Sequence, residues 1–205
     1  MDPLLHGIVL AFGLILPLGV QNVFVFNQGA THPAFTRALP AITTAAICDT
    51  LLISLAVTGV SVVVFTFDWL RTALFVAGFL FLTYMGWAMW RTAPETETIR
   101  ETSRLSAKQQ ILFAASVSLL NPHAIMDTIG VIGTSSLVYS GEEKWMFTAA
   151  VIGVSWIWFL SLAAVGRKVG QFDTGGKLLK RINQLSALIV WAMALFILSQ
   201  LFTYQ

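Results

Sequence analysis

The chain has few charged residues and a single cysteine. Asp, Glu, Lys and Arg make up 11% of its 205 residues, whereas soluble domains carry about 25%. Cys48 is the one cysteine, which excludes an intrachain disulfide and any Cys-x-x-Cys redox or metal motif. A net charge of +2 is too small to favour a nucleic-acid partner. The chain also lacks the alternation of apolar and polar residues that a transmembrane β-barrel needs.

Long apolar runs dominate instead. The sequence is 57% hydrophobic, and its mean hydropathy is +0.78. Its uncharged runs of about 20 residues can cross a bilayer as helices, which predicts an all-α polytopic membrane protein with six transmembrane helices. The expected spans are residues 4–26, 38–67, 70–90, 111–138, 145–165 and 185–202. The second and fourth spans exceed about 20 residues, which implies tilt or a break. No basic segment precedes the first run, so we expect a retained span rather than a cleaved signal peptide.

The positive charges lie between these runs and predict an orientation. Two loops are extended and polar, residues 91–110 and the basic, glycine-containing stretch 166–181. The loops after spans one, three and five hold Arg37, Arg91, Arg100, Arg104, Lys108, Arg167, Lys168, Lys177, Lys180 and Arg181, and the other side holds only Arg71 and Lys144. By the positive-inside rule, the first group of loops is cytoplasmic and both termini face outward.

Two spans contain residues that are costly in lipid. Asp49 is the one charge of the second span, and Asp127 lies in the fourth, five residues after Pro122. An intramembrane carboxylate usually has a function, because its insertion costs about 2.5 kcal/mol or more. Pro17 and Gly19 interrupt the first span as Pro122 interrupts the fourth, and a proline breaks a helix by removing a hydrogen bond.

The polar linker 93–109 divides the chain into two halves of three spans, residues 1–92 and 110–205. An odd number of spans per half means that the halves enter the membrane in opposite directions. Both halves begin with a span that carries proline and amide residues, in segments 16–22 and 120–123. This pattern is typical of inverted-repeat transporters, whose substrate sites lie between paired broken helices.

The same segments resemble a known family. Residues 15–29, ILPLGVQNVFVFNQG, and 120–128, LNPHAIMDT, resemble the LGPQN…QG and LNP…LD motifs of the LysE/ArgO family of basic amino-acid exporters. Cys48-Asp49 resembles the Ser-Asp of its second span, and residues 155–159, SWIWF, resemble its fifth-span aromatic stretch. Val20 departs from the family's proline and Cys48 from its serine.

The resemblance implies a multi-pass transporter in the bacterial cytoplasmic membrane, not an enzyme and without a cofactor. Its partners would be the lipid bilayer, protons and a small-molecule substrate, arginine or lysine, exported by proton antiport. Export of neutral amino acids is an alternative, and a non-transporting membrane scaffold is a less favoured one. The related export of divalent metals is disfavoured, because the chain has three histidines, one cysteine and no His-rich loop.

Candidate site residues follow from position. Asp49 and Asp127 can pair with a cation or bind a proton, and one residue can do both in alternation. Four residues flank the breaks: Gln21, Asn22, Asn121 and His123. They can bind the amino-acid backbone or simply satisfy the interrupted helices. His123 can relay protons or only donate a hydrogen bond.

Two further sets of residues each allow two interpretations from the sequence alone. Trp156 and Trp158 can stack on a cationic substrate or pack against the broken helices. Small residues such as Gly78, Gly86 and Gly153 can serve packing within the chain or the face of a homodimer.

Overall fold

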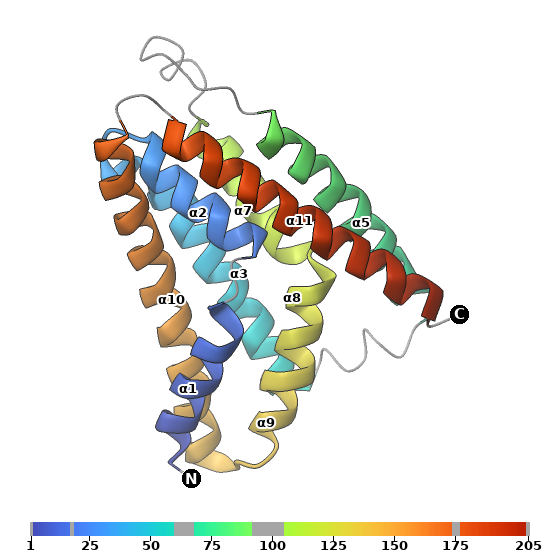
Figure 1. Cartoon of the computed structure of the whole chain (residues 1–205). Helices are drawn as coiled ribbons and strands as arrows, with labels where there is room; N and C mark the ends of the chain where they lie inside the picture. Colours follow the sequence, from blue (N-terminus) through green and yellow to red (C-terminus); the bar gives the residue numbers. More distant parts are fainter. Residues whose placement is uncertain (1, 17–18, 60–67, 92–104, 174–176, 204–205) are drawn as a thin grey trace.

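The computed structural model describes residues 2–16, 19–59, 68–91, 105–173 and 177–203, and all regular structure in these ranges is helical (Figure 1). The elements are α1 (Pro3–Ile15), α2 (Val20–Thr31), η1 (Phe35–Ala38), α3 (Leu39–Val57), α5 (Asp68–Trp90), α7 (Ala107–Leu119), α8 (Pro122–Asp127), the π-helical turn η2 (Thr128–Gly133), α9 (Thr134–Ser136), α10 (Gly141–Phe172) and α11 (Lys177–Thr203).

The first expected span consists of two helices. Asp2 caps α1 by accepting hydrogen bonds from the backbone N–H groups of Leu4 and Leu5. The helix ends at Ile15, α2 begins after Gly19, and the two are inclined to each other by 82°. Pro17 lies outside the described residues. The change of direction leaves backbone groups of both helices near the middle of the molecule.

The fourth expected span is also interrupted. Ser106 and Gln109 form a capping box that begins α7. The helix ends at Leu119, and α8 begins at Pro122 in the first helical position. A residue before proline is forced out of the helical region, and Asn121 accordingly has φ −89° and ψ 99°. Beyond the break, α8, η2 and α9 continue to Ser136.

One expected boundary was wrong, and another falls partly outside the described residues. The second span was expected to cover residues 38–67 with tilt or a break; α3 ends at Val57 and a turn follows, and residues 60–67 lie outside the described residues. Gly59 has a φ of +78° in that turn, a conformation that ends helices and favours glycine. The stretch 166–181 was expected to be a loop, but residues 166–172 belong to α10 and residues 177–181 to α11.

Helix packing explains why α10 continues through its glycines. At Gly166 and Gly170, the backbone carbonyls of Phe26 and Ala30 in α2 lie where a side chain would begin. Gly29 of α2 faces the backbone of Ala163 in the same way. Glycine is a poor helix former, but here its lack of a side chain lets α2 and α10 pack backbone to backbone.

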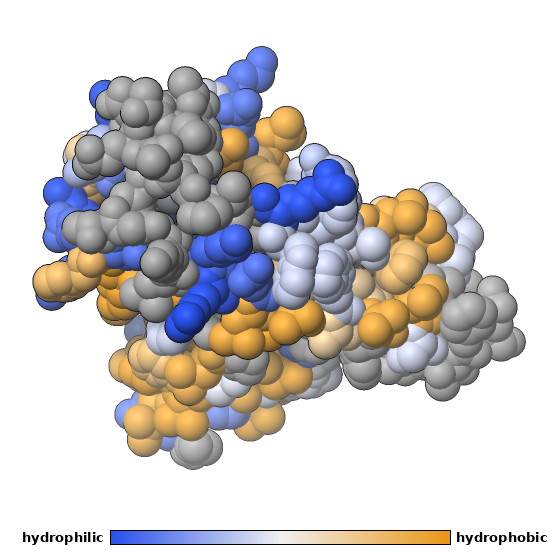
Figure 2. Space-filling view, turned by 45° about the horizontal axis from the view of Figure 1, so that its top comes forward, coloured by the Kyte–Doolittle hydropathy of each residue, from blue (hydrophilic) through white to orange (hydrophobic). Residues whose placement is uncertain are grey.

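Among the described residues, two helical segments are long and apolar enough to cross a membrane, residues 35–57 and 141–172, and α1 with α2 would make a third as one bent span. The expected third and sixth spans coincide with α5 and α11. Figure 2 shows apolar side chains over much of the surface on the viewed face, as a lipid-facing surface requires. The chain is therefore a helical membrane protein, and the full set of six spans stays a prediction.

Several helix contacts of one half of the chain have a counterpart in the other half. The broken pair α1 and α2 lies along α10, and in the other half α7 and η2 lie along α3. α3 also contacts α10, and α5 lies beside α11 (Figure 1). Within the α5–α11 pair, Gly86 lies against the indole of Trp191, which is a packing role within the chain. Gly153 has open space where its side chain would be.

Two apolar clusters form much of the core around the broken helices. The first apolar cluster contains Phe24, Val25, Ala38, Ala41, Ile42, Ala45, Ala46, Ala114, Phe159 and Ala163. The second contains Ala11, Ile53, Val57, Ile132, Tyr139, Phe147, Val151 and Val154. Along α3, Asp49 lies between Ala46 of the first cluster and Ile53 of the second. Along α10, Ser155 lies between Val154 and Phe159 in the same way. Polar residues of both helices therefore separate the two clusters.

Candidate functional site

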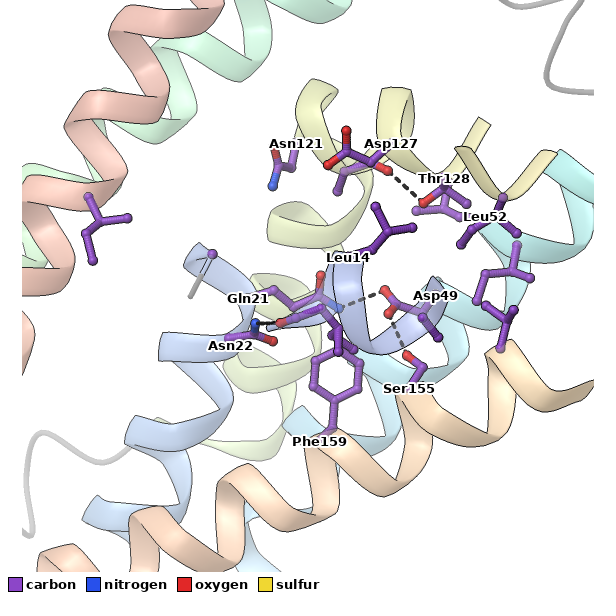
Figure 3. A pocket seen from close by; sticks show the side chains of 18 residues that line it. Leu14, Gln21, Asn22, Asp49, Leu52, Asn121, Asp127, Thr128, Ser155 and Phe159 are labelled. Atoms are coloured by element: carbon purple, nitrogen blue, oxygen red, sulfur yellow. Dashed lines mark hydrogen bonds between the residues drawn. The ribbon is translucent and has the colours of Figure 1, made fainter. Parts of the chain in front are cut away.

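A cavity of about 510 Å³ lies where polar residues separate the two apolar clusters (Figure 3). Its wall comes from α1, α2, α3, α8, η2, α10 and α11, so both broken spans contribute. The polar residues on the wall are Gln21, Asn22, Asp49, Asn121, Asp127, Thr128 and Ser155. The volume falls in the range typical of small-molecule sites.

Asp49 is held by hydrogen bonds from two other helices. Gln21 Nε2 on α2 donates to Asp49 Oδ1 at 3.0 Å, and Ser155 Oγ on α10 donates to Asp49 Oδ2 at 2.6 Å. Each carboxylate oxygen thus accepts one hydrogen bond, which fixes the orientation of the carboxylate on the cavity wall. Hydrogen bonds to an ionised group are stronger than neutral ones, so this arrangement suits a negative charge at Asp49.

Asn22 bridges the break in the first span. Its Nδ2 donates to the carbonyl oxygen of Ile15, at the end of α1, at 2.9 Å. Trp158 Nε1 on α10 donates to Asn22 Oδ1 at 3.2 Å. The last turn of a helix leaves carbonyl groups without helical partners, and Asn22 satisfies one of them. These contacts fit the structural interpretation of this amide.

The second break places a different amide on the wall. Asn121 is 5% exposed and lines the cavity, and among the described residues its Oδ1 has no hydrogen-bond partner. Figure 3 shows Asn121 and Asp127 on one side of the cavity, facing the group of Gln21, Asp49 and Ser155. The Oδ1 atom itself is enclosed by protein, so Asn121 contributes a polar side-chain amide to the wall and not an exposed acceptor.

Not every expected residue lines this site. The wall takes Val151, Ser155 and Phe159 from α10, which are four residues apart and so share a face. Neither Trp156 nor Trp158 is on the wall. Trp156 Nε1 donates to Thr50 Oγ1 at 3.1 Å, and Trp158 binds Asn22 as described. The tryptophans therefore lie behind the wall and join α10 to α3 and α2.

The backbone of His123 occupies the second position of α8, but its side chain and that of Pro122 lie outside what the structure describes. Gly19 is the residue before α2 and lies on the cavity wall. Sequence reasoning gave no role to Ser155 or Thr128. The spacing of four between Ser155 and Phe159 was the one signal available for Ser155, because it places both on the same helical face.

Every charged side chain on the wall, within the part of the chain that the structure describes, is acidic. Two carboxylates, Asp49 and Asp127, line it, and none of the described lysine or arginine residues does. Among the described residues there is no group of three or more His, Cys, Asp or Glu side chains that could hold a metal ion. The wall can therefore accept a cation with several hydrogen-bond donors, and the apolar side chains around it suit an organic one.

Comparisons with known proteins agree with a transport site. The family described as LysE type translocator matches residues 12–201. The chain is 59% identical over 194 residues to the provisionally named amino-acid transporter YisU of Bacillus subtilis, covering 95% of this chain and 88% of YisU. It is 30% identical to the arginine exporter protein ArgO of Pectobacterium atrosepticum, covering 93% and 94% of the two chains, and 29% identical to ArgO of Salmonella typhi, covering 92% and 90%.

No solved structure matches the chain. The family match extends over nearly the whole chain, from α1 to α11, and includes every residue on the cavity wall except Ala11. The chain therefore belongs to the LysE type translocator family and is a membrane transporter, not an enzyme.

Proposed function

We propose that this protein exports basic amino acids, arginine or lysine, from the cytoplasm in exchange for protons. The observation that carries the proposal is the pair of carboxylates, Asp49 and Asp127, on the wall of one cavity whose described lining residues include no lysine or arginine. A cationic substrate finds opposite charge there. The relatives named as arginine exporters support the same substrate class.

The cavity offers separate surfaces for the parts of such a substrate. Asp49, fixed by Gln21 and Ser155, takes the cationic side chain. The side-chain amide of Asn121, on the opposite side of the cavity, binds the backbone end of the amino acid. Leu14 and Leu52 on the wall contact the methylene groups between them.

The same carboxylates allow exchange with protons. A carboxylate in an apolar environment is stable either when paired with a cation or when neutralised by a proton. Loss of the substrate to the outside is therefore favoured by proton binding, and return of the protonated site to the cytoplasmic side releases the proton. The two apolar clusters are the barriers, one on each side of the cavity, that open in turn.

The proposal includes the topology that exchange requires. The six spans form two inverted repeats, residues 1–92 and 110–205, joined by a cytoplasmic linker over residues 93–109. The packing of α1 and α2 on α10, matched by that of α7 and η2 on α3, supports this symmetry. Both termini lie outside the bacterial cytoplasmic membrane, as the distribution of Lys and Arg indicates.

A second candidate function is export of neutral amino acids. The observation that favours it is the wall itself, which is mostly apolar and includes Leu14, Ile15, Leu52 and Phe159. The name of YisU specifies an amino acid but not its charge. A neutral side chain would lie on this apolar wall, with Asp49 left to bind the proton.

Efflux from proteoliposomes separates the two functions. The purified protein is reconstituted into vesicles loaded with labelled arginine, lysine or leucine, and efflux is followed after an acidic external medium is applied. We expect fast efflux of arginine or lysine, slow efflux of leucine, and none in the Asp49→Asn variant. Efflux of leucine alone would favour the second candidate. No efflux of any amino acid would contradict both.

A further inference from the structure

Ser155 differs from many serine and threonine residues in these helices. A hydroxyl inside a helix commonly donates to the carbonyl four residues earlier. The described residues that do so are Thr31, Thr43, Thr50, Ser54, Thr58, Ser116, Ser118, Thr128, Thr134 and Thr148. Ser155 is 3% exposed and donates instead across the helix interface to Asp49 Oδ2.

The two partners of Asp49 respond differently to a proton. A side-chain amide nitrogen donates hydrogen bonds and cannot accept one, whereas a hydroxyl can do both. Gln21 Nε2 therefore requires Asp49 Oδ1 to remain an acceptor. Ser155 Oγ is the partner that can accept a hydrogen bond from a protonated carboxyl group.

We propose that the coupling proton binds at Asp49 Oδ2 and that Ser155 is the positioning residue that makes both protonation states acceptable. The proposal rests on the proposed function. In the ionised state, Ser155 Oγ donates to Oδ2 as observed. When a proton from the outer medium forms the O–H bond at Oδ2, that O–H donates to Ser155 Oγ. The serine hydroxyl then turns to the carbonyl of Val151, four residues earlier, as the other hydroxyls of these helices do.

Every hydrogen bond is thus satisfied in both states. The proton does not pass through Ser155; it stays on Asp49 until it is released to the cytoplasmic side, and no other bond is made or broken. Protonation removes the charge that held the cation while the three helices α2, α3 and α10 stay connected. A carboxylate with two amide partners would not have this freedom, because protonation would set donor against donor.

Among the side chains that the structure describes, few other titratable groups lie near Asp49. Asp127 shares the cavity wall from α8, and Cys48 precedes Asp49 on α3 and is buried. The wall residues from α2, α10 and α11 bring no titratable side chain. A change in pH dependence on altering Ser155 would therefore report on Asp49, provided that Asp127→Asn does not produce the same change.

The test compares two transport modes in proteoliposomes for the wild type and Ser155→Ala. One mode is arginine efflux driven by a pH gradient, and the other is exchange of labelled for unlabelled arginine with no gradient. We expect the rate of gradient-driven efflux to fall by about tenfold or more, because the variant loses one hydrogen bond to a charged group. The rate of exchange should change much less. Ser155→Thr keeps a hydroxyl and restores gradient-driven efflux. Ser118→Ala is the matched control, because Ser118 is equally buried and donates to the carbonyl of Ala114.

Two results would overturn the proposal. One is a Ser155→Ala variant whose efflux follows pH as the wild type does. The other is an equal loss in both modes, which would show that Ser155 supports the site as a whole and not the proton. If Ser155→Ala does not reach the membrane, Ser155→Cys takes its place with the same expectation, because a thiol is a weak donor and acceptor. If the wild-type protein moves no amino acid, the proposed function itself is contradicted. That outcome differs from a wild type that transports and a Ser155→Ala variant that transports equally well, which contradicts only the role of Ser155.

Discussion

Replacement of Asp49 by asparagine removes one charge and little else. The amide oxygen can still accept the hydrogen bond from Gln21 Nε2, and the amide nitrogen can donate to Ser155 Oγ, where the carboxylate now accepts at 2.6 Å. The connections of α3 to α2 and α10 are therefore kept. We expect the Asp49→Asn variant to fold and reach the membrane in normal amounts.

The effect on substrate affinity follows from the lost charge. A pair of opposite charges about 4 Å apart is worth about 4 kcal/mol at an effective dielectric constant of about 20. The amide retains a neutral hydrogen bond worth about 1 kcal/mol. The difference of about 3 kcal/mol corresponds to a loss of affinity of about 100-fold.

The assay is arginine binding to purified protein in nanodiscs, followed by isothermal titration calorimetry or by the rise in melting temperature with arginine. Asp49→Leu is the instructive comparison, because it leaves Gln21 Nε2 without its carboxylate partner and should also lower thermal stability. Wild-type affinity for arginine in Asp49→Asn would refute the assignment of this carboxylate to the cationic group.

Three further predictions concern the rest of the site and the fold. Asn121→Leu should weaken arginine binding by about tenfold, because the substrate loses a hydrogen bond to the side-chain amide; calorimetry measures it, and unchanged affinity would exclude this role. Gly166→Leu should abolish the close contact of α10 with α2 and lower the melting temperature and yield, whereas Gly153→Leu, where space is open, should do neither; equal stability of the two variants would contradict the packing. A cysteine at Thr98 in a Cys48→Ser background should resist an impermeant thiol reagent in intact cells, and rapid labelling would reverse the predicted orientation.

Much of the fold can be predicted from the apolar runs and prolines of the sequence. Runs without charge can satisfy their backbone in lipid only as helices, so the expected spans coincide with helical segments. The break at Pro122 is local chemistry, because proline excludes its predecessor Asn121 from the helical region. Helical spans and proline breaks depend on residues that are near neighbours in the chain, so they can be predicted from the sequence.

The misread loop came from contacts between distant segments. Gly166 and Gly170 suggested a loop, but the backbone of α2 occupies the space beside them, and packing overrides their poor helix propensity. The end of α3 at Val57 is a local feature instead, because Gly59 has a positive φ in the turn that follows, and the length of that apolar run had already implied tilt or a break.

The two carboxylates of the candidate site are visible in the sequence, whereas the hydrogen bonds that hold Asp49 are not. Asp49 and Asp127 were visible because acids are rare in apolar spans. The contact of Ser155 with Asp49 joins residues 106 positions apart, and a serine in an apolar helix usually bonds to its own backbone. Apart from its spacing of four from Phe159, nothing local distinguishes Ser155 from Ser161, and only the packing of α3 on α10 gives Ser155 a partner. The same packing places Trp156 and Trp158 behind the wall instead of on it.

Proton movement during arginine efflux tests the central claim most directly. Proteoliposomes loaded with arginine and a pH-sensitive dye are diluted into arginine-free medium of the same pH, with the membrane potential clamped. Exchange predicts that the interior acidifies as arginine leaves the wild-type vesicles, and that neither change occurs with Asp49→Asn. Arginine efflux without acidification, or acidification that persists in Asp49→Asn, would contradict proton exchange at this carboxylate.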